Sequence, residues 1–74
     1  MQYDYSKLIG RIIEIFGTRS AFAEKMDISN RTLSLKLNNK IAWKQPEMEK
    51  AANLLLFPLS DIQVYFFTLK VQSD

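Results

Sequence analysis

The chain has 74 residues, 47% of them hydrophobic, which suffices for one domain with one small core. It contains no cysteine and no histidine, which excludes disulfides, zinc sites built on those ligands, and the commonest general base. The net charge is only +2, but residues 18–44 hold six basic and two acidic residues, a modest footprint for a polyanion that an ordinary solvated surface could equally produce.

The first predicted helix spans residues 5–16 and ends at Gly17. Asp4 or Ser6 is the expected N-cap, because both side chains can accept backbone N–H bonds. The apolar residues that recur with helical spacing are Leu8, Ile12, Ile15 and Phe16, widened by Ile9 and Ile13.

Two shorter helices are predicted within residues 18–39, with a turn at Asp27 between them. Their expected caps are Thr18 or Ser20 and then Ser29 or Asn30. Their inner apolar residues are Ala21, Phe22, Ala23, Met26, Leu33 and Leu37. The second of these helices ends at Asn38 and Asn39, since asparagine tolerates left-handed backbone.

Pro46 marks the first turn of a fourth helix, and the pair at 57–58 breaks it. Ser60 is expected to cap a last short helix reaching Phe66, while residues 68–74 fit either a strand or a loose end. Trp43 lies in the loop at 40–45, where we favour exposure over burial. The expected fold class is therefore all-α, a compact bundle of about five short helices, with an extended C-terminal tail left open.

Residues 18–39 have the spacing of a helix-turn-helix within one domain that covers 1–74. That motif needs a small residue at the helix crossing, a residue that tolerates unusual backbone angles, and a buried aliphatic residue after the turn. Ala23, Asp27 and Ile28 meet those needs in order. With Leu33 and Leu37 facing inward, the helical wheel turns Arg31 and Leu35 outward.

Outward positions near the start of such a helix reach base edges in the major groove. The candidate base-reading residues are Asn30, Arg31, Ser34 and Leu35, on a recognition helix at about 29–38. The candidate phosphate-contacting residues are Arg19, Ser20, Asn38, Lys40 and Lys44. Helix pairs with this spacing also occur in proteins that bind no nucleic acid.

Residues 18–34 resemble the helix-turn-helix of the Cro and lambda-repressor class. Nearly the whole chain resembles small XRE-type phage and prophage regulators of Gram-positive bacteria, through residues 4–8, 31–40, 65–67 and 70–72. The resemblance implies a five-helix DNA-binding regulator of the choice between lytic and lysogenic growth. Three residues depart from that pattern and leave room for another partner: Arg19 for a glutamine, Asp27 for the turn glycine, and Leu35 for a polar reader.

Two functions therefore stay open. A Cro-like transcriptional regulator would bind a duplex operator, either as a homodimer through the apolar stretch 64–69 or as a monomer. A phage antirepressor or modulator would instead form a heteromer with a repressor protein, through the helix-turn-helix or an apolar surface within 59–74 and its surroundings. The partner-surface candidates are Trp43, Tyr65, Phe66 and Phe67, with Leu35 and Phe57 as further apolar residues.

We expect no enzyme, cofactor or metal site, because the acidic residues are scattered and no nucleophile–base pair or glycine-rich phosphate loop occurs. We expect a cytoplasmic protein without membrane contact, because neither a signal peptide nor an apolar run of transmembrane length is visible.

Overall fold

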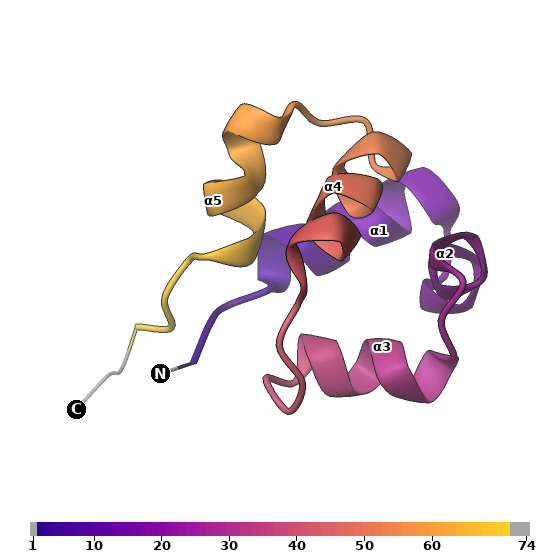
Figure 1. Cartoon of the computed structure of the whole chain (residues 1–74), viewed down its shortest axis with the longest axis horizontal. Helices are drawn as coiled ribbons and strands as arrows, with labels where there is room; N and C mark the ends of the chain where they lie inside the picture. Colours follow the sequence, from indigo (N-terminus) through magenta and orange to yellow (C-terminus); the bar gives the residue numbers. More distant parts are fainter. Residues whose placement is uncertain (1, 72–74) are drawn as a thin grey trace.

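The computed structural model describes residues 2–71 and contains five α-helices and one 3₁₀ turn (Figure 1). They are α1 (Ser6–Phe16), α2 (Arg19–Met26), α3 (Asn30–Leu37), α4 (Gln45–Leu54), η1 (Leu59–Asp61) and α5 (Ile62–Phe66). The predicted all-α bundle is confirmed. No helix among the described residues is long and apolar enough to cross a membrane.

The helices surround one core, with α1 and α4 at the centre of the molecule (Figure 1). The first helix packs against α2 and α5, and α4 contacts the same two helices from the other side of the core. In contrast, α3 lies along the lower edge of the view, beyond α2. This arrangement leaves one long side of α3 free of other helices.

The two ends of the described chain lie side by side. The N–H of Asp4 donates to the carbonyl of Thr68 at 2.6 Å, the N–H of Lys70 donates to that of Gln2 at 3.2 Å, and Tyr3 and Leu69 form an isolated antiparallel bridge. The sequence left open whether the tail forms a strand or a loose end. The structure shows this single bridge, and no full strand forms among residues 2–71. The last part of the predicted tail, residues 72–74, lies outside the described residues.

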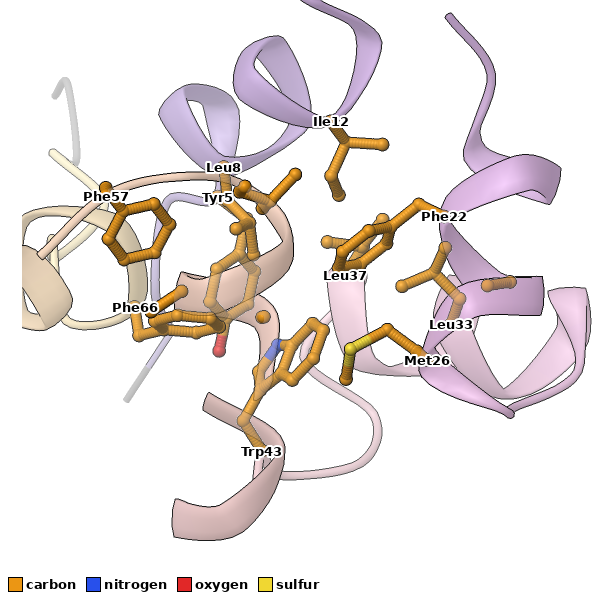
Figure 2. Packing of buried hydrophobic residues seen from close by; sticks show 14 residues of the cluster. Tyr5, Leu8, Ile12, Phe22, Met26, Leu33, Leu37, Trp43, Phe57 and Phe66 are labelled. Atoms are coloured by element: carbon orange, nitrogen blue, oxygen red, sulfur yellow. The ribbon is translucent and has the colours of Figure 1, made fainter. Parts of the chain in front are cut away.

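The core joins an aliphatic side and an aromatic side (Figure 2). Its largest fully buried side chains are Phe22, Phe66, Leu8, Ile12, Leu33 and Leu55. Burying each contributes roughly 1.5–3 kcal/mol, so these few residues hold the helices together. The apolar stripe predicted for α1 is too wide, because Ile15 is 36% exposed and Ile13 is 45% exposed.

Side-chain caps fix the helix starts on either side of Asp27. The Oγ1 of Thr18 accepts from the N–H of Ala21 at 3.1 Å, and the Oγ of Ser29 accepts from the N–H of Thr32 at 3.0 Å. The cap predicted for α1 at Asp4 or Ser6 is wrong, because its N-cap is Tyr5 and no side chain caps this helix. The carboxylate of Asp4 does accept from the N–H of Ser6, the first residue of α1, at 2.8 Å. The prediction for Ser60 is wrong, because this residue lies inside η1, which has no side-chain cap.

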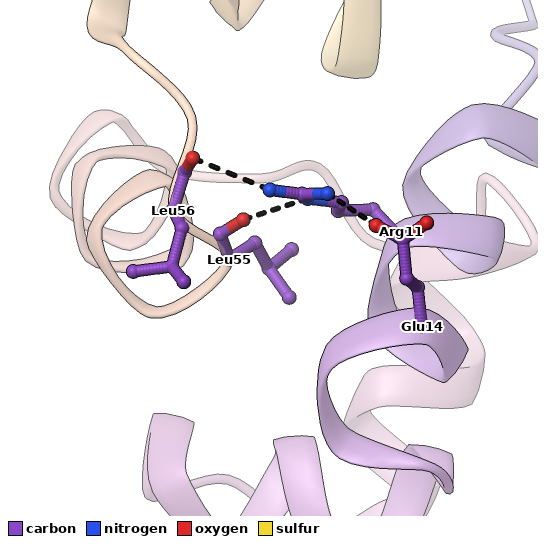
Figure 3. Close-up of polar contacts among 4 residues, drawn as sticks. All are labelled: Arg11, Glu14, Leu55 and Leu56. Carbon is purple, nitrogen blue, oxygen red and sulfur yellow. Dashed lines mark hydrogen bonds and ion pairs between the residues drawn. The ribbon is translucent and has the colours of Figure 1, made fainter.

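Arg11 fixes the end of α4 from across the core (Figure 3). Its Nε donates to the carbonyl of Leu55 at 2.8 Å and its Nη2 to that of Leu56 at 3.3 Å, while Glu14 pairs with the same guanidinium. The helix therefore ends at Leu54 with Leu56 in the left-handed region at φ 61°, earlier than the proline at 58 requires. A cation at a helix C-terminus is also favoured by the helix dipole.

Candidate nucleic-acid and partner interface

The turn between α2 and α3 is built on a left-handed aspartate. Asp27 has φ 62° and ψ 40°, and its N–H donates to the carbonyl of Glu24 at 3.1 Å. The next N–H, that of Ile28, donates to the carbonyl of Ala23 at 3.0 Å. Ala23 is buried as expected, whereas Ile28, expected to be buried, is half-buried and packs against the edge of the core.

The outward face of α3 carries the polar candidates. Leu33 and Leu37 are buried, whereas Asn30, Arg31 and Ser34 are exposed. The fourth candidate base-reading residue, Leu35, is only half-buried and does not project freely as expected. Its carbonyl accepts the N–H groups of Lys40 at 2.8 Å and Ile41 at 3.3 Å, so the chain folds back along this part of α3.

Two candidates on α3 hydrogen-bond to each other rather than standing free. The Nδ2 of Asn38 donates to the carbonyl of Ser34 at 2.9 Å and to its Oγ at 3.3 Å. In contrast, the guanidinium of Arg31 forms no ion pair with any other described residue. Arg31 is therefore the candidate on α3 whose charge is fully available to a ligand.

An open groove between α2 and α3 is lined both by residues predicted to contact DNA and by acidic residues. It is lined by Ser20 and Asn30, two predicted DNA contacts, and by Glu24 and Asp27. Both acidic residues are exposed, so they would lie close to anything that entered the groove. Negative charge at this place opposes a phosphate backbone and favours a cationic group.

The remaining phosphate candidates, Arg19, Lys40 and Lys44, are exposed. They belong to the start of α2 and to the loop between α3 and α4, so they flank the groove and α3 along the chain. Their positions are compatible with contacts to a polyanion.

Lys36 is unexpectedly buried for a lysine, with only 2% of its surface exposed. Its Nζ donates to the carboxylate of Glu47 at 2.8 Å and to the carbonyl of Ala42 at 3.1 Å, and lies 5.5 Å from the centre of the Trp43 ring. One of the six basic residues in 18–44 is thus removed from the surface. The helical wheel gives no sign of this pair, which forms across a loop.

The carboxylate of Glu47 links the same loop to the start of α4. It also accepts from the backbone N–H of Lys44 at 2.8 Å. Burial raises the pKa of Glu47, but the bonds from Lys36 and from the Lys44 N–H outweigh burial and hold this pKa below its ordinary value of 4.5. The carboxylate of Glu47 therefore stays ionised near neutral pH, and its bonds to Lys36 and to the Lys44 N–H fix the loop after α3.

The aromatic partner candidates divide into buried and exposed residues. Trp43 and Phe66 are buried, 5.1 Å apart between ring centres, which corrects the expectation that they are available to a partner. Tyr65 is half-buried and stacks on Phe57, which is itself buried, at 4.0 Å. Only Phe67, 42% exposed, leaves a large apolar surface open.

Comparison with known proteins places the chain in a family. The family model for a protein of unknown function, DUF739, matches residues 1–69. The chain belongs to this family. No curated protein matches it.

One solved structure is similar over almost the full length. It is the solution structure of the modulator of repression of the temperate bacteriophage TP901-1 from Lactococcus lactis. The two chains are 50% identical, 97% of each is covered, and the TM-score is 0.80. This DUF739 protein is therefore similar to a phage regulator, as the sequence resemblance implied, but to one named for modulating repression rather than to a Cro-type repressor.

Proposed function

We propose that this DUF739 protein is a phage regulator that modulates repression by binding a repressor protein. The observation that carries the proposal is its 50% identity, across 97% of both chains, to a phage modulator of repression. Such a role needs a binding surface rather than a catalytic site, and the α2–α3 face offers one.

The charges on that face support a protein partner. A repressor that binds DNA must present cationic side chains to phosphate groups. The groove with Glu24 and Asp27 is complementary to such a surface. Asp27 also lies at the turn where the helix-turn-helix class that the sequence resembles usually has a neutral glycine. Contact with this groove would cover the repressor's own DNA-binding residues and so relieve repression.

The test is to mix the protein with its cognate repressor and to measure the mass of the complex by size exclusion with light scattering. We expect a heteromer whose dissociation constant rises about tenfold or more in the double variant Glu24→Gln/Asp27→Asn, since close charge pairs at interfaces are commonly worth over ~1.5 kcal/mol. Asparagine tolerates the left-handed turn, so the variant keeps the backbone. Glu49→Gln, on the exposed part of α4, is the matched control.

Absence of a heteromer with the unchanged protein would refute the proposal. A heteromer that forms equally well in the double variant would refute the role of the groove while leaving the partner intact.

Binding of duplex DNA is the second candidate, favoured by the guanidinium of Arg31 at the start of α3, which is exposed and pairs with no acidic residue within 2–71. The test is titration of an operator fragment at several salt concentrations, since phosphate contacts make affinity fall steeply with salt. Arg31→Ala should weaken binding to the preferred sequence by roughly 1–3 kcal/mol. If this variant loses the operator but keeps the repressor, the two activities use separate surfaces.

A homodimer through 64–69 stays a prediction. Val64, Phe67 and Leu69 are exposed and could form its apolar contacts. Light scattering of the protein alone, in the same experiment, measures it directly.

A further inference from the structure

A pocket lies away from the α2–α3 groove, where the loop after α3 meets the N-terminal segment and α5. It encloses about 280 Å³. Its walls include five aromatic rings, those of Tyr3, Tyr5, Trp43, Phe66 and Phe67. Ligand pockets are mostly apolar and start near ~300 Å³, so this space suits one ring with a small substituent.

An unsatisfied hydrogen-bond donor lies behind the wall of the pocket, covered by neighbouring atoms. Among residues 2–71, the indole Nε1–H of Trp43 is the buried side-chain polar group that has no acceptor. Figure 2 shows this nitrogen on the side of the indole that faces Tyr5 and Phe66, two residues of the pocket wall. Buried donors in native proteins nearly always have a partner, so the missing acceptor calls for an external one.

The residues that line the pocket are all uncharged. Burial, and then the neighbouring Tyr3, raise the pKa of the Tyr5 hydroxyl above its ordinary value of 10.0, so this hydroxyl on the wall stays neutral near neutral pH. The amide of Asn39, another wall residue, is already engaged, since it accepts from the N–H of Tyr3 at 2.8 Å and donates to its carbonyl at 3.0 Å. The unmet need is thus for one neutral acceptor.

We propose that this pocket binds a small uncharged molecule with a flat apolar ring and a carbonyl oxygen. The ring packs among the aromatic walls, and the oxygen accepts from Trp43 Nε1. Because Nε1 is covered by its neighbours, the oxygen reaches it only when Tyr5 or Phe66, the two rings that pack against the indole, shifts slightly. The site is independent of the repressor-binding proposal.

The single tryptophan makes the test direct, because the protein has one indole N–H resonance in a ¹H–¹⁵N spectrum. The probes are acetophenone, which has a ring and a carbonyl, and toluene, which has the ring alone. We expect acetophenone to shift the indole resonance saturably with a millimolar dissociation constant, and toluene to bind at least threefold more weakly without shifting that proton downfield.

Two variants locate the site. Ala42→Phe adds a ring at an exposed position of the pocket wall and should weaken acetophenone at least tenfold. Asn53→Phe adds the same ring at an exposed position of α4 that is not part of the pocket, and should bind as the unchanged protein does.

Equal binding of the two probes would overturn the role of Trp43 as donor. A resonance that does not move up to saturating acetophenone would overturn the site itself, and would mean that water satisfies the N–H. Neither result bears on the complex with a repressor, because no partner is present in the experiment.

Discussion

The two ends of α3 differ in how they are held. At its start, Ser29 caps the helix and Asp27 turns the chain, so local hydrogen bonds fix the geometry while Arg31 stays exposed. After its end, the loop is held by contacts from distant parts of the chain, such as the pairing of Lys36 with Glu47 and the burial of Trp43. Local hydrogen bonds therefore fix the exposed start of α3, whereas packing with residues farther along the chain holds the loop after its end.

The largest expected effect on stability comes from truncating a buried ring on the aromatic side of the core. Phe66→Ala removes a side chain that is 1% exposed and contacts the rings of Trp43 and Phe57. We expect a loss of about 3–5 kcal/mol in the free energy of unfolding, close to the whole stability of a domain this small. Urea denaturation followed by tryptophan fluorescence measures it.

Leu35→Ala is the control at the exposed side of α3. Leu35 is half-buried, so its truncation should cost no more than about 1 kcal/mol. Equal losses of unfolding free energy in Phe66→Ala and Leu35→Ala would contradict the distinction between the packed core and the surface of α3.

Breaking the buried ion pair comes next. Lys36→Met leaves the Glu47 carboxylate without its ammonium partner, and we expect a loss of about 3 kcal/mol, the low end for a buried pair because Glu47 keeps 24% of its side chain exposed. Adding Glu47→Gln should restore much of that loss, since the amide oxygen can still accept from the Lys44 N–H. Chemical denaturation of the two single variants and the double variant gives the coupling energy.

If the double variant is no more stable than the sum of the single variants predicts, then Lys36 does not act on stability through Glu47. Its contacts with the Ala42 carbonyl and the Trp43 ring would then be the important ones.

Acid provides a reversible way to weaken the same pair. The pKa of Glu47 is lower in the folded chain than its ordinary value of 4.5, so the unfolded chain binds more protons below this pH. The stability that Glu47 contributes is therefore fully present above about pH 4.5 and is lost as the pH falls through the lower, folded pKa. We expect the free energy of unfolding to decline less steeply with acid in Glu47→Gln.

Asp4 is the control for this titration, because hydrogen bonds from the Ser6 side chain and backbone lower its pKa in the same pH range. Asp4→Asn should remove its own part of the acid dependence and leave that of Glu47. An unchanged acid dependence in Glu47→Gln would show that the carboxylate is not the group that responds.

The sequence allowed prediction of features that depend on near neighbours. The fold class, the left-handed Asp27 and the burial of Leu33 and Leu37 follow from helical spacing and turn chemistry. The places of Trp43, Lys36 and Arg11 could not be predicted, because each depends on contacts with residues distant along the chain. The acidic residues of the candidate groove were visible in the sequence, but only the packing of α2 on α3 shows that Glu24 and Asp27 lie beside Ser20 and Asn30.

The smallest expected effect is the loss of one helix cap, measured by comparing a serine that caps a helix with a serine that only matches the sequence pattern of a cap. Ser29→Ala removes the acceptor for the Thr32 N–H and should cost about 1 kcal/mol, whereas Ser60→Ala should change stability by less than ~0.5 kcal/mol, because Ser60 lies within η1 and caps nothing. Thermal unfolding of both variants by circular dichroism measures the difference. Because Ser29 holds the start of α3, its loss should also weaken binding of the repressor, while Ser60→Ala should leave that binding unchanged. If the two serines had equal effects on stability, the start of α3 would owe its position to the packing of Leu33 and Leu37 rather than to its cap. Both ends of α3 would then be held by tertiary packing.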